Sequence, residues 1–156
     1  MAIEEVKEYF KQYGLEGRIK EFDVSSATVE LASQALNCEP KRIAKTLSFL
    51  LDDKCILVVT AGDAKIDNSK YKSQFGKKAR MLNAEEVVEY TGHKVGGVCP
   101  FTVKEGVDIY LDESLKRFQT VFPACGSNNS AIELTLDELE KYSNSNKWVN
   151  ICKGWD

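Results

Sequence analysis

The sequence lacks the features that would place it quickly in a common class of protein. No apolar run approaches the roughly 20 residues of a membrane-spanning helix, and the segment Met1–Lys7 is charged from the start, without a signal-peptide core. One histidine and five dispersed cysteines without a CxxC pair favour neither a disulfide framework nor a zinc site. We therefore expect a cytoplasmic protein with no metal, no cofactor and no membrane partner.

The common catalytic motifs are missing as well. The chain has no GxxxxGK[ST] phosphate loop and no GxGxxG fingerprint, and Ser127 is not part of a GxSxG elbow. One alternative is a thiol hydrolase that uses Cys99 as the nucleophile and His93 as its base. A small apolar cysteine in a tight loop is more often structural, so the sequence favours chemistry without a side-chain nucleophile.

What is present is the composition of an ordinary folded protein, with 43% hydrophobic and 29% charged residues. We expect one domain over residues 1–156. The net charge of −3 gives no overall nucleic-acid signal, but residues 65–80 contain six basic residues and one acidic residue. This stretch favours either a contact with phosphates or a solvated helix face.

Apolar periodicity and turn residues predict interleaved helices and strands. The runs on either side of Asp52-Asp53-Lys54 predict an antiparallel hairpin, which favours a mixed sheet with flanking helices over a doubly wound parallel sheet. Asn83 and Thr135 begin capping-box patterns. Helices are expected over 2–13, 28–36, 68–75, 83–91 and 135–142, and strands over 19–22, 41–51, 55–60, 107–111, 120–122, 131–134 and 147–152.

Lys45 is the candidate functional residue that stands out first. In a strand over 41–51 it shares a face with Leu47 and Phe49, because side chains alternate between the two faces. Burying an ammonium on an apolar face is costly without a partner, so we expect the strand to open into a polar cavity at Lys45. The alternative is a lysine at the strand start that extends into solvent.

Two loops could complete such a site. The first, Gly96–Phe101, has two glycines that let the backbone approach a ligand and a proline that fixes one end. The second, Ala124–Ser130, places small polar residues after a glycine, as in the polar rim of a pocket or in an ordinary turn. Exposed N–H groups in such a loop could hold a carbonyl or ribose oxygen.

Lys45, the GxxxP loop of Gly96 to Pro100 and the Gly126-Ser127 pair follow one another in an order that resembles the YbaK/prolyl-tRNA synthetase-associated domain family. The resemblance covers roughly residues 24–155 and implies an α+β fold with a central mixed, barrel-like sheet and flanking helices. It also implies a free-standing, trans-acting aminoacyl-tRNA deacylase. Such an enzyme would hydrolyse the ester of mischarged tRNA that carries a small amino acid such as cysteine or alanine, with tRNA-Pro as the expected tRNA.

The resemblance also implies roles for individual residues. Lys45 would orient the substrate, Gly96 and Pro100 would bound the loop around the terminal adenosine, and Ser127 would line the aminoacyl pocket. The expected partners are the tRNA acceptor end and, as a second candidate, prolyl-tRNA synthetase. Some members carry a carboxylate shortly after the glycine-serine turn, where this chain has the uncharged residues Asn128 to Ala131. The expected catalytic residues are Lys45, Gly96 and Ser127, and the expected substrate-binding residues are Gly97, Val98, Cys99, Pro100, Phe101, Gly126 and Asn128.

The uncharged turn after Ser127 supports one further alternative. A protein that kept the pocket but lost turnover would be a non-catalytic aminoacyl-adenosine or tRNA-binding module of the same fold.

Overall fold

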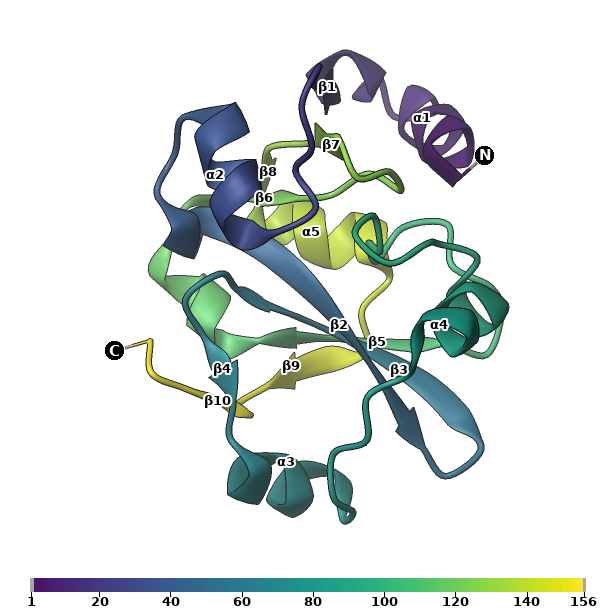
Figure 1. The fold of residues 1–156 in the computed structure, drawn as a ribbon, viewed down its shortest axis with the longest axis vertical. Coiled ribbons are helices and arrows are strands. Elements are labelled where there is room, and N and C mark those ends of the chain that lie inside the picture. The colour runs from purple at the N-terminus through teal and green to yellow at the C-terminus, as the bar shows by residue number, and fades with distance from the viewer. Residues whose placement is uncertain (1, 156) are drawn as a thin grey trace.

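A computed structural model describes residues 2–155 of the chain. Its centre is a curled, mixed six-stranded sheet with strand order β8-β6-β2-β3-β5-β9 (Figure 1). The hairpin of β2 and β3 is antiparallel, whereas β6, β5 and β9 join through parallel pairings. This arrangement confirms the predicted α+β fold. The strands are β2 (Ile43–Leu51), β3 (Lys54–Ala61), β5 (Asp108–Asp112), β6 (Thr120–Pro123), β8 (Leu134–Thr135) and β9 (Lys147–Val149).

Within residues 2–155, five α-helices surround the sheet, and local sequence explains where most of them begin and end. The Thr28 side chain caps one helix, and both predicted capping boxes, at Asn83 and Thr135, are present. Each such cap is worth about 1 kcal/mol of helix stability. The helices are α1 (Ala2–Lys11), α2 (Val29–Leu36), α3 (Asn68–Phe75), α4 (Ala84–Thr91) and α5 (Leu136–Ser143), with short 3₁₀ turns at Glu16–Arg18, Pro40–Arg42 and Glu113–Arg117.

Two of the predicted strands are wrong in their extent. The run over 131–134 contributes to two separate strands, and so does the run over 147–152, because the chain bends in the middle of each and its halves pair with different partners. Sequence periodicity does not reveal this change of partner. The additional strands form two small antiparallel pairs: β1 (Lys20–Glu21) with β7 (Ser130–Ala131), and β4 (Lys65–Ile66) with β10 (Cys152–Lys153).

Beside the main core, two small apolar clusters lie under two different helices. Ala32 of α2 packs with Ile43 and Phe122 in one cluster, and Val87 of α4 packs with Leu82 in the other. In Figure 1, α2 lies near the start of the diagonal strand β2 and α4 lies toward its other end. The region of β2 between the two clusters is where the candidate site lies. None of the helices within residues 2–155 has the length and apolar character needed to cross a membrane.

Candidate functional site

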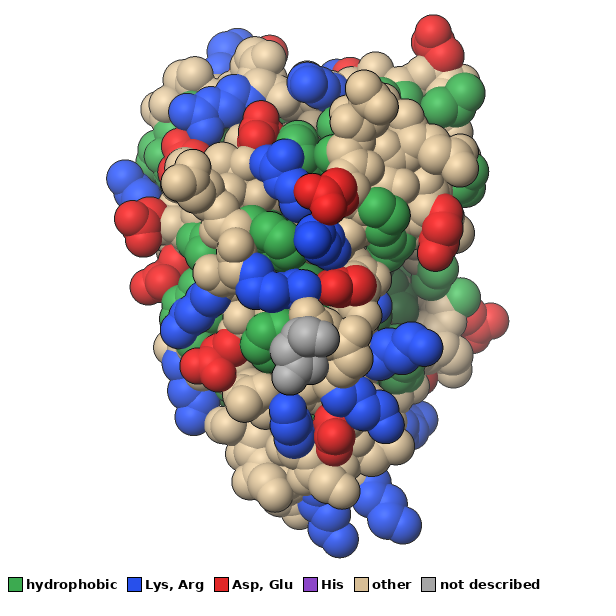
Figure 2. Space-filling view, turned by 90° about the vertical axis from the view of Figure 1, so that its left-hand side faces the viewer, with side chains coloured by type: hydrophobic (Ala, Val, Ile, Leu, Met, Phe, Trp, Pro, Cys, Tyr) green, Lys and Arg blue, Asp and Glu red, His purple; other side chains and the backbone are tan. Residues whose placement is uncertain are grey.

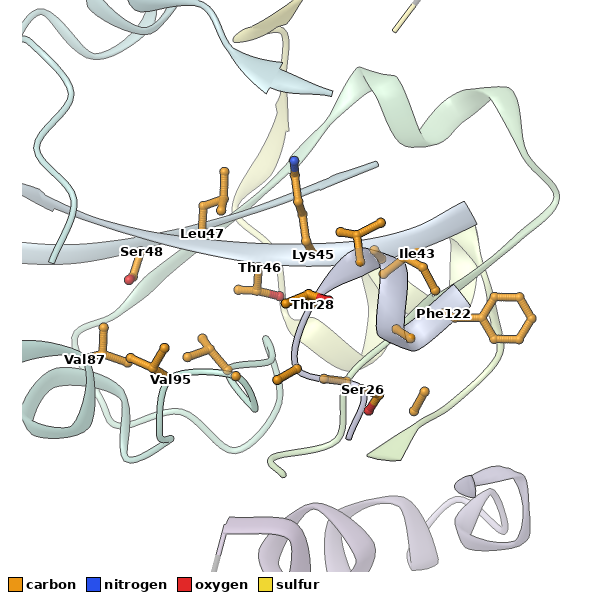
Figure 3. Close-up of a pocket in the computed structure, with 18 of the residues that line it drawn as sticks. Ser26, Thr28, Ile43, Lys45, Thr46, Leu47, Ser48, Val87, Val95 and Phe122 are labelled. Atoms are coloured by element: carbon orange, nitrogen blue, oxygen red, sulfur yellow. The ribbon is translucent and has the colours of Figure 1, made fainter. Parts of the chain in front are cut away.

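A cavity of about 380 Å³ lies between the two small clusters, and β2 forms its floor. One wall comes from the start of α2 and the chain before it, and the other from residues 81–98 (Figure 3). Its volume lies at the small end of the range for small-molecule sites. The lining residues with hydroxyl groups are Ser26, Thr28, Thr46, Ser48 and Ser130; the lining contains no carboxylate and no histidine, and Lys45 is its one charged residue.

The cavity reaches an edge of β2 rather than only one of its faces. Six consecutive residues, 43–48, line it, although side chains alternate between faces along a strand. Pairing with β6 stops at Ala44. Farther along the same edge, Ser48 accepts a hydrogen bond from Leu82 N–H at 3.2 Å and Leu50 N–H donates to Arg80 at 2.8 Å. The strand edge between these two neighbours is open.

Lys45 lines the cavity, but its ammonium does not enter it. The Nζ atom donates to the carbonyl oxygens of Ala64, at 2.5 Å, and Gly62, at 3.5 Å. Figure 3 shows Lys45 and Leu47 on the opposite side of the strand from Thr46 and Ser48. Burial lowers the pKa of Lys45 below its ordinary value. The sequence predicted a polar cavity at Lys45; the structure has a largely apolar cavity there, and the ammonium bonds the Gly62–Ala64 turn on the other side of the strand.

The turn that holds the ammonium packs tightly against a wall of the cavity. A Cβ atom at Gly62 would lie 2.1 Å from the Pro40 carbonyl oxygen and 2.8 Å from Val29 Cγ1. Val29 belongs to α2 and lines the cavity. Lys45 is thus connected to the cavity wall through the Gly62–Ala64 turn, because any displacement of this turn would move α2.

The two predicted loops lie against each other, but they contribute unequally to the cavity. Gly96, at φ +91°, lines it, and so does Val98. A Cβ atom at Gly97 would lie 2.8 Å from the backbone of Ser127. This position therefore requires glycine so that the loops can meet, and Gly97 contributes packing rather than a lining surface. Gly126, at φ +92°, and Asn128 lie outside the lining.

Ser127, which was predicted to line the aminoacyl pocket, is absent from the lining of this cavity and contacts a neighbour that belongs to the lining. Its hydroxyl can donate to Asn129 Oδ1, at 2.9 Å, while it accepts from the Ser130 hydroxyl, whose Oγ lies 2.7 Å away. Ser130 is 1% exposed and lines the cavity. The sequence pattern located the turn correctly, but the hydroxyl that reaches the cavity lies three residues farther along.

Cys99, Pro100 and Phe101 belong to the protein interior and are absent from the cavity lining. Burial raises the pKa of the Cys99 thiol to about 12. His93 Nε2 lies 2.8 Å from the Phe101 carbonyl oxygen, which can only accept, so the ring donates at this nitrogen. His93 therefore has no free electron pair on the side of Cys99, and the alternative of a Cys99–His93 thiol hydrolase is wrong.

Thr46 and Ser48 are two lining residues that the sequence did not reveal. Among residues 2–155, the buried Thr46 Oγ1 has no hydrogen-bond partner, and Figure 3 shows both side chains on the cavity side of β2. Their alternation with Lys45 was visible in the sequence. Because a polar residue on the face opposite an apolar one ordinarily points to solvent, that alternation gave no reason to place them in a site.

The basic stretch 65–80 does not form one continuous positive surface. Lys77 pairs with Asp52 and Arg80 with Glu86, and α3, which carries the middle of the stretch, lies at the end of the molecule farthest from α1 (Figure 1). Figure 2 shows acidic side chains among the lysines and arginines on the face that includes this end. Within residues 2–155, no group of three or more His, Cys, Asp or Glu side chains could hold a metal ion.

Comparison with known proteins identifies the class to which this fold and cavity belong. The profile of the aminoacyl-tRNA editing domain matches residues 23–142, well over half of the chain. The protein belongs to the aminoacyl-tRNA editing domain family, as its resemblance to YbaK-type domains predicted, and it is related to the editing domains of prolyl-tRNA synthetases.

Some relatives match this chain over their whole length, whereas in others the matching region is a small part of a much longer protein. The uncharacterized protein YwhH of Bacillus subtilis (strain 168) is 54% identical over 157 residues and covers 100% of both chains. The proline–tRNA ligase of Halalkalibacterium halodurans is 32% identical over 104 residues, which are 66% of this chain and 18% of the ligase. The chain thus spans about a fifth of the ligases that it matches.

Solved structures of similar size share the fold over nearly their full length. A crystal structure proposed to be that of a trans-editing enzyme for prolyl tRNA synthetase is 27% identical, with a TM-score of 0.87 and 98% of both chains covered. The hypothetical protein APE2540 is 29% identical, with a TM-score of 0.83 and coverage of 95% of this chain and 99% of that one.

Proposed function

We propose that the protein is a trans-acting deacylase that hydrolyses the ester of mischarged aminoacyl-tRNA, releasing a small amino acid such as alanine or cysteine from tRNA-Pro. The observation that carries the proposal is the cavity of about 380 Å³ on the open edge of β2, in a chain of the aminoacyl-tRNA editing domain family. Its lining of hydroxyl and apolar groups, from which the one ammonium is turned away, suits a short aminoacyl group attached to a ribose.

Hydrolysis of an aminoacyl ester requires few catalytic groups from the protein. A water oxygen adds to the ester carbonyl carbon, the ribose oxygen leaves with a proton, and the products are a free amino acid and a tRNA. Because the ester is already activated, positioning and stabilisation of the oxyanion can supply the acceleration. One well-placed oxyanion donor is worth on the order of 10²–10³ in rate. The lining has no cysteine, and it has no histidine or carboxylate that could activate one of its hydroxyl groups, which is consistent with this scheme.

The three residues expected to be catalytic take different roles in this proposal. Gly96 lines the cavity and brings backbone close to the substrate. Lys45 positions the wall, since its ammonium holds the Gly62–Ala64 turn against α2. Ser127 positions Ser130, whose hydroxyl it contacts at 2.7 Å.

Selection in such a cavity works mainly by exclusion. One methylene group is worth only about 1–3 kcal/mol of attraction, so a small pocket separates amino acids better by clash than by affinity. The apolar part of the lining, which includes Ala32, Val87 and Phe122, contacts other side chains and leaves limited room for expansion. We expect alanyl and cysteinyl groups to enter and the prolyl ring to be excluded.

The proposed partner is the acceptor end of the tRNA, with prolyl-tRNA synthetase as a second candidate that would deliver mischarged tRNA. This part of the proposal is supported by the family and by the related prolyl-tRNA synthetase domains. Basic residues of the stretch 65–80, such as Lys72 and Lys78, would contact phosphates of the acceptor stem.

The test is a deacylation assay of the purified chain with alanyl-, cysteinyl-, seryl- and prolyl-tRNA-Pro, each corrected for spontaneous hydrolysis. We expect multiple turnovers with at least one of the first three and none with prolyl-tRNA-Pro. Repeating the assay with prolyl-tRNA synthetase added shows whether that partner is needed. Release of no amino acid under either condition would contradict the proposal.

A second candidate function is a non-catalytic module that binds an aminoacyl-adenosine or a tRNA end. The specific observation in its favour is that no titratable side chain points into the cavity from the lining residues. Tight binding of an uncleavable aminoacyl-adenosine analogue without hydrolysis of the matching ester would support it. Multiple turnover would exclude it.

A further inference from the structure

The open edge of β2 presents an unused set of backbone groups. In an antiparallel pair, residues that bond the partner through both N–H and C=O alternate with residues whose two groups point away. Ser48 and Leu50 bond away from β3, toward Leu82 and Arg80. By this alternation, the N–H and C=O groups of Thr46 also point away from β3, toward the cavity.

Thr46 has no ladder partner on this edge. Pairing of β2 with β6 covers only Ile43 and Ala44, and within residues 2–155 no backbone hydrogen bond joins Thr46 to the neighbouring segment. Its buried Oγ1 also lacks a partner. A donor, an acceptor and a hydroxyl of one residue are therefore unsatisfied at the cavity floor, although buried polar groups are ordinarily paired.

The gap is one residue long. Ala44 is paired on one side and Ser48 on the other, which leaves a single outward-facing residue between them. At about 3.3 Å per residue, the two ends of the gap lie roughly 13 Å apart along β2. The chain cannot fill the gap itself, because β6 ends at Pro123 and the segment beside Ser48 continues into the cap of α4 at Asn83.

We propose that the aminoacyl group of the substrate binds this gap as a one-residue antiparallel strand, with its α-ammonium donating to the Thr46 carbonyl and its ester carbonyl accepting from the Thr46 N–H. An aminoacyl ester carries the same donor and acceptor as one residue of a peptide strand. This inference rests on the proposed function, because it assigns the groups that hold the substrate of that reaction.

The geometry of the pairing fixes the direction of the substrate. In an antiparallel pair, the carbonyl of the bound residue lies beside the N–H of Thr46, on the Ala44 side, and its ammonium lies on the Ser48 side. Ser48, which is 6% exposed and lines the cavity, can then add a hydroxyl acceptor for the ammonium. The scissile bond and the ribose would point toward the wall formed by the start of α2, where Gly96 approaches Ala27.

This arrangement also accounts for the missing carboxylate. The lining holds Ala131 and no acidic residue, so an ammonium must be satisfied by neutral acceptors. The Thr46 carbonyl and the hydroxyl groups of Thr46 and Ser48 provide these acceptors without a charged group. An aminoacyl group whose α-nitrogen is acylated would extend past the gap and meet Leu82. The site would therefore be restricted to aminoacyl groups with a free α-ammonium.

The test is amide hydrogen exchange of Thr46, measured by NMR on the full-length ¹⁵N-labelled chain. The probe is 3′-deoxy-3′-(L-alanylamino)adenosine, and the control ligand is 3′-amino-3′-deoxyadenosine, which lacks the aminoacyl group. At saturation with the probe we expect exchange at Thr46 to slow by about tenfold or more, as for one added hydrogen bond to a polar ligand. The control ligand should leave it unchanged, and Thr60, paired with Lys45 inside the ladder, should not respond to either.

A set of variants tests the hydroxyl separately. Thr46→Val should weaken binding of the probe about five- to tenfold, whereas Thr46→Ser should stay within about twofold of the original chain. Thr102→Val is the matched control, since Thr102 Oγ1 is also buried without a partner among residues 2–155 but lies outside the cavity lining. It should leave binding unchanged.

The outcomes separate this inference from the proposed function. Unchanged exchange at Thr46 with the probe bound, or no binding of the probe at all, would overturn the inference, even if the chain deacylates tRNA. Protection of Thr46 without any deacylation would support the inference and contradict the proposed enzyme, leaving a binding module.

Discussion

The two faces of β2 around Lys45 and Thr46 differ in whether their polar side chains have hydrogen-bond partners. On one face, the half-buried Lys45 donates its ammonium to the carbonyls of Gly62 and Ala64. On the other, a buried hydroxyl has no partner within the described residues, and the neighbouring strand edge is open. The charged residue therefore satisfies groups of the protein, whereas the neutral residue leaves groups free for a ligand. The most conspicuous residue of the sequence thus extends its charged group away from the cavity.

Removing the Lys45 ammonium should have the largest effect on the site. Lys45→Ala leaves two carbonyls of the turn without their donor, which should displace the turn and the α2 wall that packs on it. We expect kcat/KM for deacylation to fall on the order of hundredfold, with a loss of unfolding free energy of about 1–3 kcal/mol. Steady-state deacylation and urea unfolding measure the two effects. Full activity in a folded variant would show that this face of β2 does not support the site.

Disturbing the contact between the loops at Gly97 and Ser127 should have the second-largest effect on stability and deacylation. Gly97→Ala places a Cβ atom 2.8 Å from the Ser127 backbone, so the loops must separate. We expect a loss of about 1–3 kcal/mol of unfolding free energy, as for other overpacking substitutions, with reduced deacylation. Gly17→Ala is the control, because a Cβ atom there meets nothing within 4 Å. Equal stability of the two variants would contradict the close packing.

The burial of His93 should make the free energy of unfolding depend on pH. Burial lowers the pKa of His93 below 6.5, so the unfolded chain binds a proton at this residue more readily than the folded chain does. Stability is therefore greatest above pH 6.5 and falls as the pH drops through 6.5 toward the folded pKa. Denaturant unfolding of the original chain and of His93→Gln between pH 7.5 and pH 5 measures the difference. The same change of stability with pH in the original chain and in His93→Gln would contradict this assignment to His93.

The smallest expected effect concerns the basic stretch. Lys72 and Lys78 have no ion-pair partner among residues 2–155, whereas Lys77 is paired with Asp52. Neutralising both unpaired lysines should weaken tRNA binding a few-fold and reduce the slope of log affinity against log salt by about 1–2. Lys116→Ala, which removes a lysine outside this stretch, is the control. An unchanged slope would remove residues 65–80 from the tRNA-binding surface.

Much of the fold could be predicted because its local signals agree. Thr28, Asn83 and Thr135 cap helices where the sequence placed them, and the β2–β3 hairpin follows from two apolar runs around a polar turn. The helix predicted over 68–75 coincides with α3 (Asn68–Phe75), although the sequence analysis did not name Asp67 as the residue that caps it. Partners that depend on the path of the chain, such as those of β7, β8 and β10, have no local signal.

The candidate site was predicted only in outline. Lys45, Gly96 and Val98 do line the cavity, but alternation along a strand cannot show whether the chain pairs both edges of that strand. The open edge at Thr46 results from where β6 ends and where residues 80–82 join β2. Ser130 was missed for a similar reason, since the direction of each hydroxyl in the turn depends on the packing of Gly97 against Ser127.

The central claim, that ester hydrolysis takes place in the cavity on the edge of β2, is tested most directly by closing that cavity. Val95 is 62% exposed and lines the cavity, whereas Val88, on α4, is 43% exposed and lies outside the lining. We predict that Val95→Trp, by filling the entrance, lowers kcat/KM on the aminoacyl-tRNA that the original chain hydrolyses best by about hundredfold or more, while Val88→Trp leaves it within about twofold. Equal activity of the two folded variants would contradict the account.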